Sequence, residues 1–146
     1  MKTLAAVVTE IGKPLSLMEL DIEDPRDDEI LVRIVASGVC HTDLVVQAGM
    51  LPVPLPVTLG HEGAGVVEKI GSKVSKVKPG DHVVLSFNSC GSCESCIEKE
   101  PAYCYEFMAR NFGAVREDGS TSLSNDNSPV HGNFFGQSSF ATFSLC

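Results

Sequence analysis

Basic residues are scarce in this sequence of 146 residues. Eleven lysines and arginines stand against nineteen aspartates and glutamates, which gives a formal net charge of −8. No stretch gathers basic side chains into a patch that could follow a phosphate backbone. The charge pattern therefore argues against a nucleic-acid partner.

Long apolar runs are missing as well. The amino-terminal apolar run ends at Thr9 and Glu10, too early for the core of a signal peptide, and no later segment approaches the roughly twenty apolar residues that span a bilayer. We therefore expect a soluble, cytoplasmic protein with no membrane partner. In that reducing compartment the six cysteines are expected to be metal ligands or free thiols rather than disulfides.

The length indicates one domain, and neither an internal repeat nor a linker divides it. Short runs rich in valine, isoleucine and leucine, separated by turn-forming residues, predict strands over residues 3–8, 14–22, 29–40, 63–71, 74–87 and 138–146. Many short strands with frequent turns predict a mainly β protein, a barrel or a sandwich.

Two other segments differ from this strand pattern. Residues 41–49 predict a short helix, which Thr42 or Asp43 can cap and Gly49 can end. Residues 110–136 are polar and rich in glycine, serine and asparagine. They predict a long surface loop with at most one weak strand.

The densest motif is SCGSCESCIEKEPAYC at residues 89–104. Its cysteines, Cys90, Cys93, Cys96 and Cys104, follow the spacing C-x2-C-x2-C-x7-C. A loop this tight can place four thiolates tetrahedrally around one Zn2+, which gives a closed structural site without an open position for substrate. A ferredoxin cluster motif would close with C-x3-C-P, whereas here seven residues intervene and Tyr105 follows. Zinc is favoured, and an iron–sulfur cluster or disulfides remain alternatives.

A second group of chemically active residues lies in GVCHTD at 38–43 and GHEGAG at 60–65. It supplies a thiol at Cys40, an imidazole at His61 and carboxylates at Asp43 and Glu62. A catalytic zinc takes three protein ligands and keeps one open position, and Cys2His is a known set. Asp43 can orient the imidazole of His61. Each residue alone would more often be structural, but together they favour a catalytic metal site.

These motifs resemble zinc-dependent alcohol dehydrogenases of the medium-chain dehydrogenase/reductase family. The resemblance rests on GVCHTDLVVQAGMLPVPLPVTLGHEGAGVVEKIGSKVSKVKPGDHV, followed by CGSCESC and Cys104. The closing FFGQSSFATF is most similar to the branch that oxidises aromatic primary alcohols such as benzyl alcohol. The resemblance implies a GroES-like, partly open β-barrel with a few short helices, spanning residues 1–146 as a catalytic domain, with a structural zinc lobe at about 89–105.

The resemblance also implies roles for individual residues. Cys40 and His61 would ligate the catalytic zinc, and Glu62 would lie just behind it. Thr42 would pass on the proton of the alcohol, and His41 would lie near the cofactor pyrophosphate. The full-length enzyme is expected to oxidise a small alcohol to an aldehyde with NAD or NADP, and to be a homo-oligomer.

The chain departs from the family pattern in two respects, a missing region and a replaced residue. No strand–G-x-G-x-x-G–helix unit is present, so a Rossmann domain and the third catalytic ligand are missing and the fragment alone is expected to be inactive. Cys146 is expected to be an ordinary strand cysteine. Val45 replaces a histidine that continues the proton relay in some members.

A few side chains receive weaker assignments. Phe87 and Leu51 are hydrophobic candidates for the wall of an aromatic pocket, and core packing explains each of them at least as well. His82 and His131 have no ligand partner nearby in sequence and are expected to be structural or solvated.

Two other functions compete with this one. A zinc-stabilised GroES-like barrel could act as a non-catalytic binding module, which the missing nucleotide fold favours and the combination of Cys40, Thr42, His61 and Glu62 opposes. A zinc-free quinone reductase of the same barrel family is disfavoured by the presence of both metal motifs.

Overall fold

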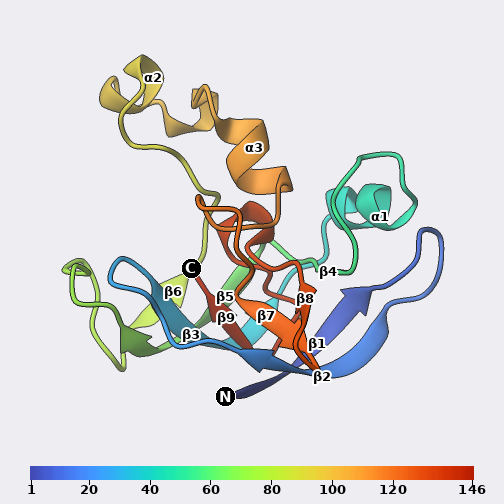
Figure 1. Ribbon diagram of the computed structural model, residues 1–146. Coiled ribbons are helices and arrows are strands. Elements are labelled where there is room, and N and C mark those ends of the chain that lie inside the picture. The colour runs from blue at the N-terminus through green and yellow to red at the C-terminus, as the bar shows by residue number, and fades with distance from the viewer.

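Two antiparallel sheets form the framework of the computed structural model, which describes all 146 residues (Figure 1). The first sheet has the order β4-β1-β2-β7-β8, with β1 (Lys2–Val8), β2 (Ser16–Ile22), β4 (Val57–Thr58), β7 (Leu123–Asn125) and β8 (Ser128–Val130). The second has the order β6-β5-β3-β9, with β3 (Ile30–Ser37), β5 (Gly63–Ile70), β6 (His82–Val84) and β9 (Phe143–Leu145). This mainly β, partly open barrel confirms the predicted fold class.

The main core lies between the two sheets. Along β1 the side chains of Thr3, Ala5 and Val7 are buried while Lys2 and Leu4 are exposed, as expected for a strand with one face on the core. The buried residues that meet there are Ala5, Val7, Leu20, Ile22, Leu31, Leu123, Val130 and Leu145. Both sheets contribute to this cluster, so it fixes how they pack.

A second apolar cluster supports the short helix α1 (His41–Gln47). Its buried members are Val8, Val46, Val57, Leu59, Ala114 and Phe134. Val46 comes from α1, and Leu59 comes from the connection between β4 and β5. The cluster therefore fixes the two chain segments that carry the second predicted metal motif.

The prediction of a long surface loop over 110–136 was wrong. The segment contains the end of α3 (Phe107–Phe112), the β7–β8 hairpin and the short 3-10 helix η2 (Phe134–Gly136). Asp126 and Asn127 connect the hairpin strands with φ of 47° and 65°, and two left-handed residues are what a tight type I′ turn requires. The hairpin adds two strands to the first sheet and buries Leu123 and Val130 in the core.

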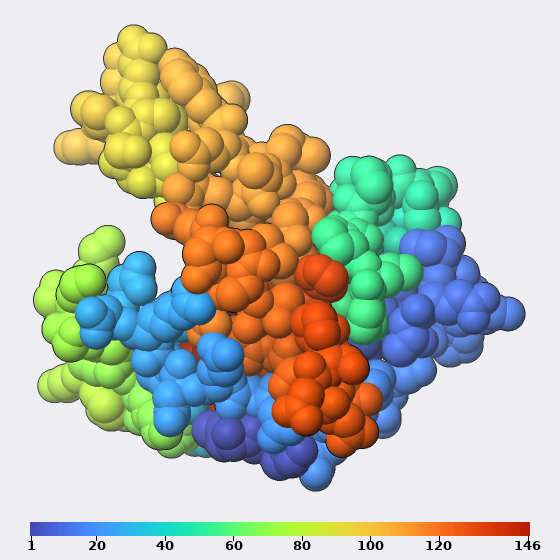
Figure 2. All heavy atoms as spheres, in the orientation of Figure 1, coloured from blue at the N-terminus to red at the C-terminus, as the bar shows by residue number.

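The predicted zinc lobe stands away from the barrel (Figure 2). It contains α2 (Glu94–Ile97) and the 3-10 helix η1 (Pro101–Tyr103), and α3 follows it. Cys104 is its one buried apolar residue, so the lobe has no hydrophobic core of its own. None of the helices, here or in the barrel, has the length and apolar character needed to cross a membrane.

Candidate metal centres

The four cysteines of residues 89–105, which we call the four-cysteine lobe, converge on one point. All four Sγ atoms lie within 4.8 Å of one another. The Sγ atoms of Cys90 and Cys96 are 3.8 Å apart. Four Zn–S bonds of about 2.3 Å at tetrahedral angles place sulfur atoms about 3.8 Å apart. The donor set and its spacing therefore fit a zinc ion with all four positions filled by protein.

Backbone N–H groups prepare these thiols for a metal. The amides of Ser92 and Cys93 donate to Cys90 Sγ at 3.5 and 3.2 Å, and the amide of Cys90 donates to Cys104 Sγ at 3.3 Å. The donors from Ser92 and Cys93 lower the pKa of the Cys90 thiol from 9.0 to about 6. Because the thiolate is the ligand form, these amides favour the metal-binding state of Cys90, whereas burial raises the pKa of the Cys96 thiol to about 11.

The second group, which we call the Cys40 cluster, consists of the donor atoms of Cys40, His61 and Glu62. These atoms also lie within 4.8 Å of one another. Cys40 follows β3 and caps α1, whereas His61 and Glu62 precede β5. β3 and β5 are paired, and their last pair is Ser37 with Gly63. The loop that follows β3 and the loop that precedes β5 therefore lie at the same end of this strand pair, which brings their donor atoms together.

Asp43 ties the two loops of the Cys40 cluster. Its side chain is buried at 3% exposure. One carboxylate oxygen accepts the amide of Cys40 at 3.0 Å, and the other accepts the amide of Gly60 at 3.0 Å and lies 3.2 Å from His61 Nδ1. An Nδ1–H that donates to Asp43 leaves Nε2 of His61 free for a metal. The predicted contact between Asp43 and His61 is thus present.

Aromatic rings form one side of the Cys40 cluster. Phe135 stacks on His61 with ring centroids 4.5 Å apart and an interplanar angle of 22°. Phe107 lies 6.1 Å from Phe135, and Phe87 lies 5.5 Å from Phe107. We call Phe135, Phe107 and Phe87 the aromatic row. It gives the cluster an apolar neighbour on which a hydrophobic ligand can pack.

The family model described as "Alcohol dehydrogenase GroES-like domain" matches residues 26–124. The matched residues form more than half of the chain and contain both groups of donors. The chain belongs to this family.

Curated relatives of this GroES-like domain are named as alcohol-oxidising enzymes. It is 51% identical to a geraniol dehydrogenase of Castellaniella defragrans over 97% of this chain and 38% of that protein. It is 38% identical to an S-(hydroxymethyl)glutathione dehydrogenase of Escherichia coli over 99% of this chain and 40% of that protein. The chain thus spans about two-fifths of the length of these relatives.

Two solved structures are similar to this chain over almost its whole length. An alcohol dehydrogenase zinc-binding domain protein from Burkholderia ambifaria matches with a TM-score of 0.98 and 50% identity, over 100% of this chain and 40% of that one. A benzyl alcohol dehydrogenase from Acinetobacter calcoaceticus matches with a TM-score of 0.94 and 47% identity, over 99% and 39% of the two chains.

Other predicted residues of the GroES-like domain lie at different distances from the Cys40 cluster. Thr42 is in the first turn of α1, with its Oγ1 3.6 Å from Cys40 Sγ. His41 begins α1 and is exposed. Leu51 packs against the apolar cluster beneath α1, and Phe87 ends the aromatic row. The structure therefore places Thr42 beside the donors and leaves the assigned role of His41 a prediction.

Three further residues lie outside both donor groups. His82 is exposed on β6, and His131 Nδ1 lies 3.2 Å from the carbonyl oxygen of Pro56. Cys146 follows β9, and its backbone pairs with Ile30. Burial raises the pKa of the Cys146 thiol, which favours the protonated thiol over the thiolate.

Sequence reasoning missed the contact of aromatic residues with His61. Phe134 and Phe135 lie in a turn where Asn133, Phe135, Gly136 and Ser138 all have φ between 51° and 68°. This left-handed backbone turns the Phe135 ring onto His61. Asn133 and Gly136, residue types that favour such a turn, were the one local indication of it.

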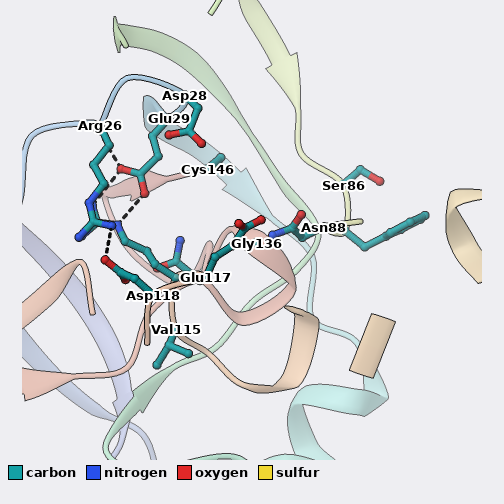
Figure 3. Close-up of a pocket in the computed structure, with 13 residues that line it drawn as sticks. Arg26, Asp28, Glu29, Ser86, Asn88, Val115, Glu117, Asp118, Gly136 and Cys146 are labelled. Carbon is teal, nitrogen blue, oxygen red and sulfur yellow. Dashed lines mark hydrogen bonds and ion pairs between the residues drawn. The ribbon is translucent and has the colours of Figure 1, made fainter. Parts of the chain in front are cut away.

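A polar hollow of about 460 Å³ lies apart from both donor groups (Figure 3). Arg26, Glu29, Arg116 and Asp118 contribute to its wall. The Arg116 side chain is 4% exposed and makes two bonds to Glu29, at 2.6 and 2.9 Å. None of the donor atoms of either metal group lines this hollow. It therefore lies over the ion pairs of the buried Arg116, and Phe87 is a residue that it shares with the aromatic row.

Proposed function

We propose that this chain is the catalytic domain of a zinc-dependent alcohol dehydrogenase, which oxidises primary alcohols with a bulky apolar or aromatic group to aldehydes. The observation that carries the proposal is the convergence of Cys40, His61 and Glu62 next to the Thr42 hydroxyl and the aromatic row. The names of the relatives, geraniol and benzyl alcohol dehydrogenases, support the same substrate class.

The donor set of the Cys40 cluster fits a catalytic zinc. Thiolate, imidazole and carboxylate are all zinc ligands. Within residues 1–146 Glu62 would therefore be the third donor, in place of the ligand that the family resemblance sets outside them, and a fourth position stays open. A zinc ion bound there supplies Lewis-acid chemistry, which lowers the pKa of an alcohol hydroxyl at the open position. The four-cysteine lobe would hold a second zinc, which stabilises its fold and takes no part in the reaction.

Asp43 and Thr42, next to the metal donors, would have separate roles. Asp43 holds the loops of Cys40 and His61 in one arrangement through its three contacts. Thr42 offers a hydroxyl close to Cys40 that can accept the proton of the alcohol and pass it on. Because the chain has Val45 on the same helix, the proton would leave through water or the cofactor rather than through a side chain at that position.

The aromatic row supports an apolar substrate. Phe135 lies directly on His61, so an alcohol bound at the open metal position would have aromatic surface beside it. Apolar side chains bury the hydrocarbon part of a ligand, and a few polar groups fix its orientation. A benzyl or isoprenoid group would suit this wall better than a small polar alcohol.

The hydride acceptor would be NAD or NADP. No G-x-G-x-x-G motif occurs in residues 1–146, and a nicotinamide cofactor is usually held by such a unit. We therefore propose that residues 1–146 form the catalytic domain and that a nucleotide-binding domain outside them holds the cofactor. The exposed His41 at the start of α1 would approach the cofactor pyrophosphate.

A chimera tests the proposal directly. Residues 1–146 replace the matching segment of the benzyl alcohol dehydrogenase from Acinetobacter calcoaceticus, which resembles this chain with a TM-score of 0.94. We expect formation of NADH or NADPH that depends on benzyl alcohol. Replacing Cys40 by serine should lower kcat/KM by about 10³-fold or more, because the metal that activates the alcohol is lost.

Cys146→Ser is the matched control, because this cysteine lies outside both donor groups. The Cys146 variant should keep the activity of the chimera. A folded chimera with zinc in both sites and no alcohol oxidation would contradict the proposal. Equal activity in the Cys40 and Cys146 variants would contradict the assigned role of the Cys40 cluster.

A further inference from the structure

Gly38 lies directly beneath the carboxylate of Glu62. A Cβ atom placed on Gly38 would overlap Glu62 Oε2 and would lie 3.1 Å from Glu62 Cβ and 3.2 Å from Glu62 Cδ. These three atoms of Glu62 are the nearest neighbours of that position. The space that a side chain at residue 38 would need is thus occupied by one residue, Glu62.

Backbone conformation does not explain the glycine. Gly60, in the other donor loop, has a φ of +88° that side chains rarely adopt, but Gly38 is outside that region. The amide of Gly38 donates to the carbonyl oxygen of Glu62 at 3.0 Å, a bond that any residue except proline can make. Because glycine has no Cβ atom, the Glu62 carboxylate can approach the backbone of residue 38 closely.

We propose that Gly38 is a positioning residue for the Cys40 cluster. The missing side chain keeps open the place in which the Glu62 carboxylate lies, and so holds Glu62 as the third donor beside Cys40 and His61. The inference rests on the proposed function, because it assumes that this cluster binds a metal.

A larger side chain at residue 38 should displace Glu62 rather than disturb the fold. Glu62 is exposed, and its carboxylate is the flexible end of the side chain. A methyl group on residue 38 therefore displaces the carboxylate toward solvent while β3 and β5 stay paired through seven residue pairs. Gly38→Ala should resemble the loss of Glu62 from the metal site rather than a loss of folding.

Cobalt binding to the 146-residue chain tests this. The four-cysteine lobe is first filled with zinc, Co2+ is added, and the thiolate-to-cobalt absorption that disappears in Cys40→Ser is assigned to the Cys40 cluster. Four proteins are compared: the unchanged chain, Gly38→Ala, Glu62→Ala and the double variant. Far-UV circular dichroism and a urea unfolding curve of each protein report on folding.

We expect Gly38→Ala and Glu62→Ala each to weaken cobalt binding by about 10- to 100-fold. In the Glu62→Ala background, the second change at Gly38 should alter the affinity by less than about twofold, because the carboxylate that it displaces is already absent. Cobalt affinity equal to that of the unchanged chain in Gly38→Ala would overturn the proposal, and so would an equal loss in both backgrounds.

Absence of any Cys40-dependent cobalt absorption in the unchanged chain would also overturn the proposal, because Glu62 would then not complete a metal site within this chain. That result would leave the proposed enzyme activity standing, since the activity of the chimera and its loss in Cys40→Ser are measured separately. A chimera without activity combined with the expected cobalt results would instead sustain the role of Gly38 and contradict the assigned reaction.

Discussion

The four-cysteine lobe and the Cys40 cluster build metal sites in opposite ways. The lobe takes all four donors from residues 90–104 of one continuous segment, and Cys104 is the one donor that is buried. The Cys40 cluster takes its donors from two loops that meet because β3 and β5 pair. A metal ion would therefore determine the shape of the lobe, which has no hydrophobic core, whereas the barrel determines the shape of the Cys40 cluster.

The neighbours of each site show the same difference. Around the lobe, backbone amides point at sulfur, and little apolar surface is buried. Around the Cys40 cluster, a buried aspartate and a stacked aromatic ring hold the donors. A site held by side chains of the surrounding fold can keep one metal position free for a substrate, because the protein does not need that position for stability.

The largest effect is expected from Cys104→Ser. A structural zinc contributes on the order of 10 kcal/mol to the segment that binds it, and without it the lobe has no core to replace that contribution. We expect the zinc content to fall by about one atom per chain, together with fast amide exchange across residues 89–105 and slow exchange in β3 and β5. Metal analysis and hydrogen exchange measure both. Fast exchange in the barrel strands as well would show that the two regions are not independent.

A smaller effect, confined to the barrel, is expected from Arg116→Met. This change leaves the Glu29 carboxylate, which is 12% exposed, without its main partner, and breaking such a pair costs about 3 kcal/mol of the free energy of unfolding. Urea unfolding measures the loss, and zinc in the lobe should be unchanged. Arg33→Met is the control, because the exposed Arg33–Glu68 pair should contribute less than about 1 kcal/mol.

Asp43→Asn should affect the Cys40 cluster alone. The amide keeps the size of the carboxylate but removes its charge and one of its acceptor atoms. Either the contact with Cys40 is lost, or the two contacts of the other oxygen with Gly60 and His61 are lost. We expect cobalt affinity at the cluster to fall by about 10-fold. Zinc at the four-cysteine lobe should remain at the level of the unchanged chain, and loss of zinc there would contradict the separation of the two sites.

The smallest expected effect is a loss of barrel stability at low pH. Burial raises the pKa of Glu29, but hydrogen bonds from Arg116 and from the Arg26 amide outweigh it and leave this pKa below its ordinary value of 4.5. A lowered pKa in the folded state stabilises the barrel above the pKa of the unfolded chain, and this contribution is lost as the pH falls through the folded value. Urea unfolding should thus show a loss of stability below about pH 4.5 that is weaker in Arg116→Met. The same slope in both proteins would contradict this account.

The sequence predicted those features that depend on residues close together in the chain. The strand runs, the helix after Cys40 and the spacing of the four cysteines all gave local patterns, and the structure contains an element at each of them. Two predicted strands were too long, because β6 covers only His82–Val84 of residues 74–87 and β9 only Phe143–Leu145 of residues 138–146. Asp43 could also be proposed as a partner of His61 because the two motifs were recognised together. The family resemblance then supplied the barrel that joins them.

Features that depend on distant partners were missed. Arg116 and Glu29 are 87 residues apart in the sequence, and no local pattern indicates that an arginine in a polar segment is buried against so distant a carboxylate. The β7–β8 hairpin was not predicted from the sequence for a related reason. Its strands are three residues each, too short for an alternating pattern, and the two-residue turn of Asp126 and Asn127 resembles any polar loop.

The pairing of β3 with β5, which ends at Ser37 and Gly63, also means that the two sites can first bind metal at different stages of folding. The lobe needs only fifteen consecutive residues, so a chain that is still emerging and unfolded can load it. The Cys40 cluster exists only after β3 and β5 have paired in the correct register, because a shift by one residue separates the two donor loops and turns their side chains to the other face. Metal uptake at the Cys40 cluster would therefore report that the barrel has closed, whereas the lobe could bind its ion before that moment.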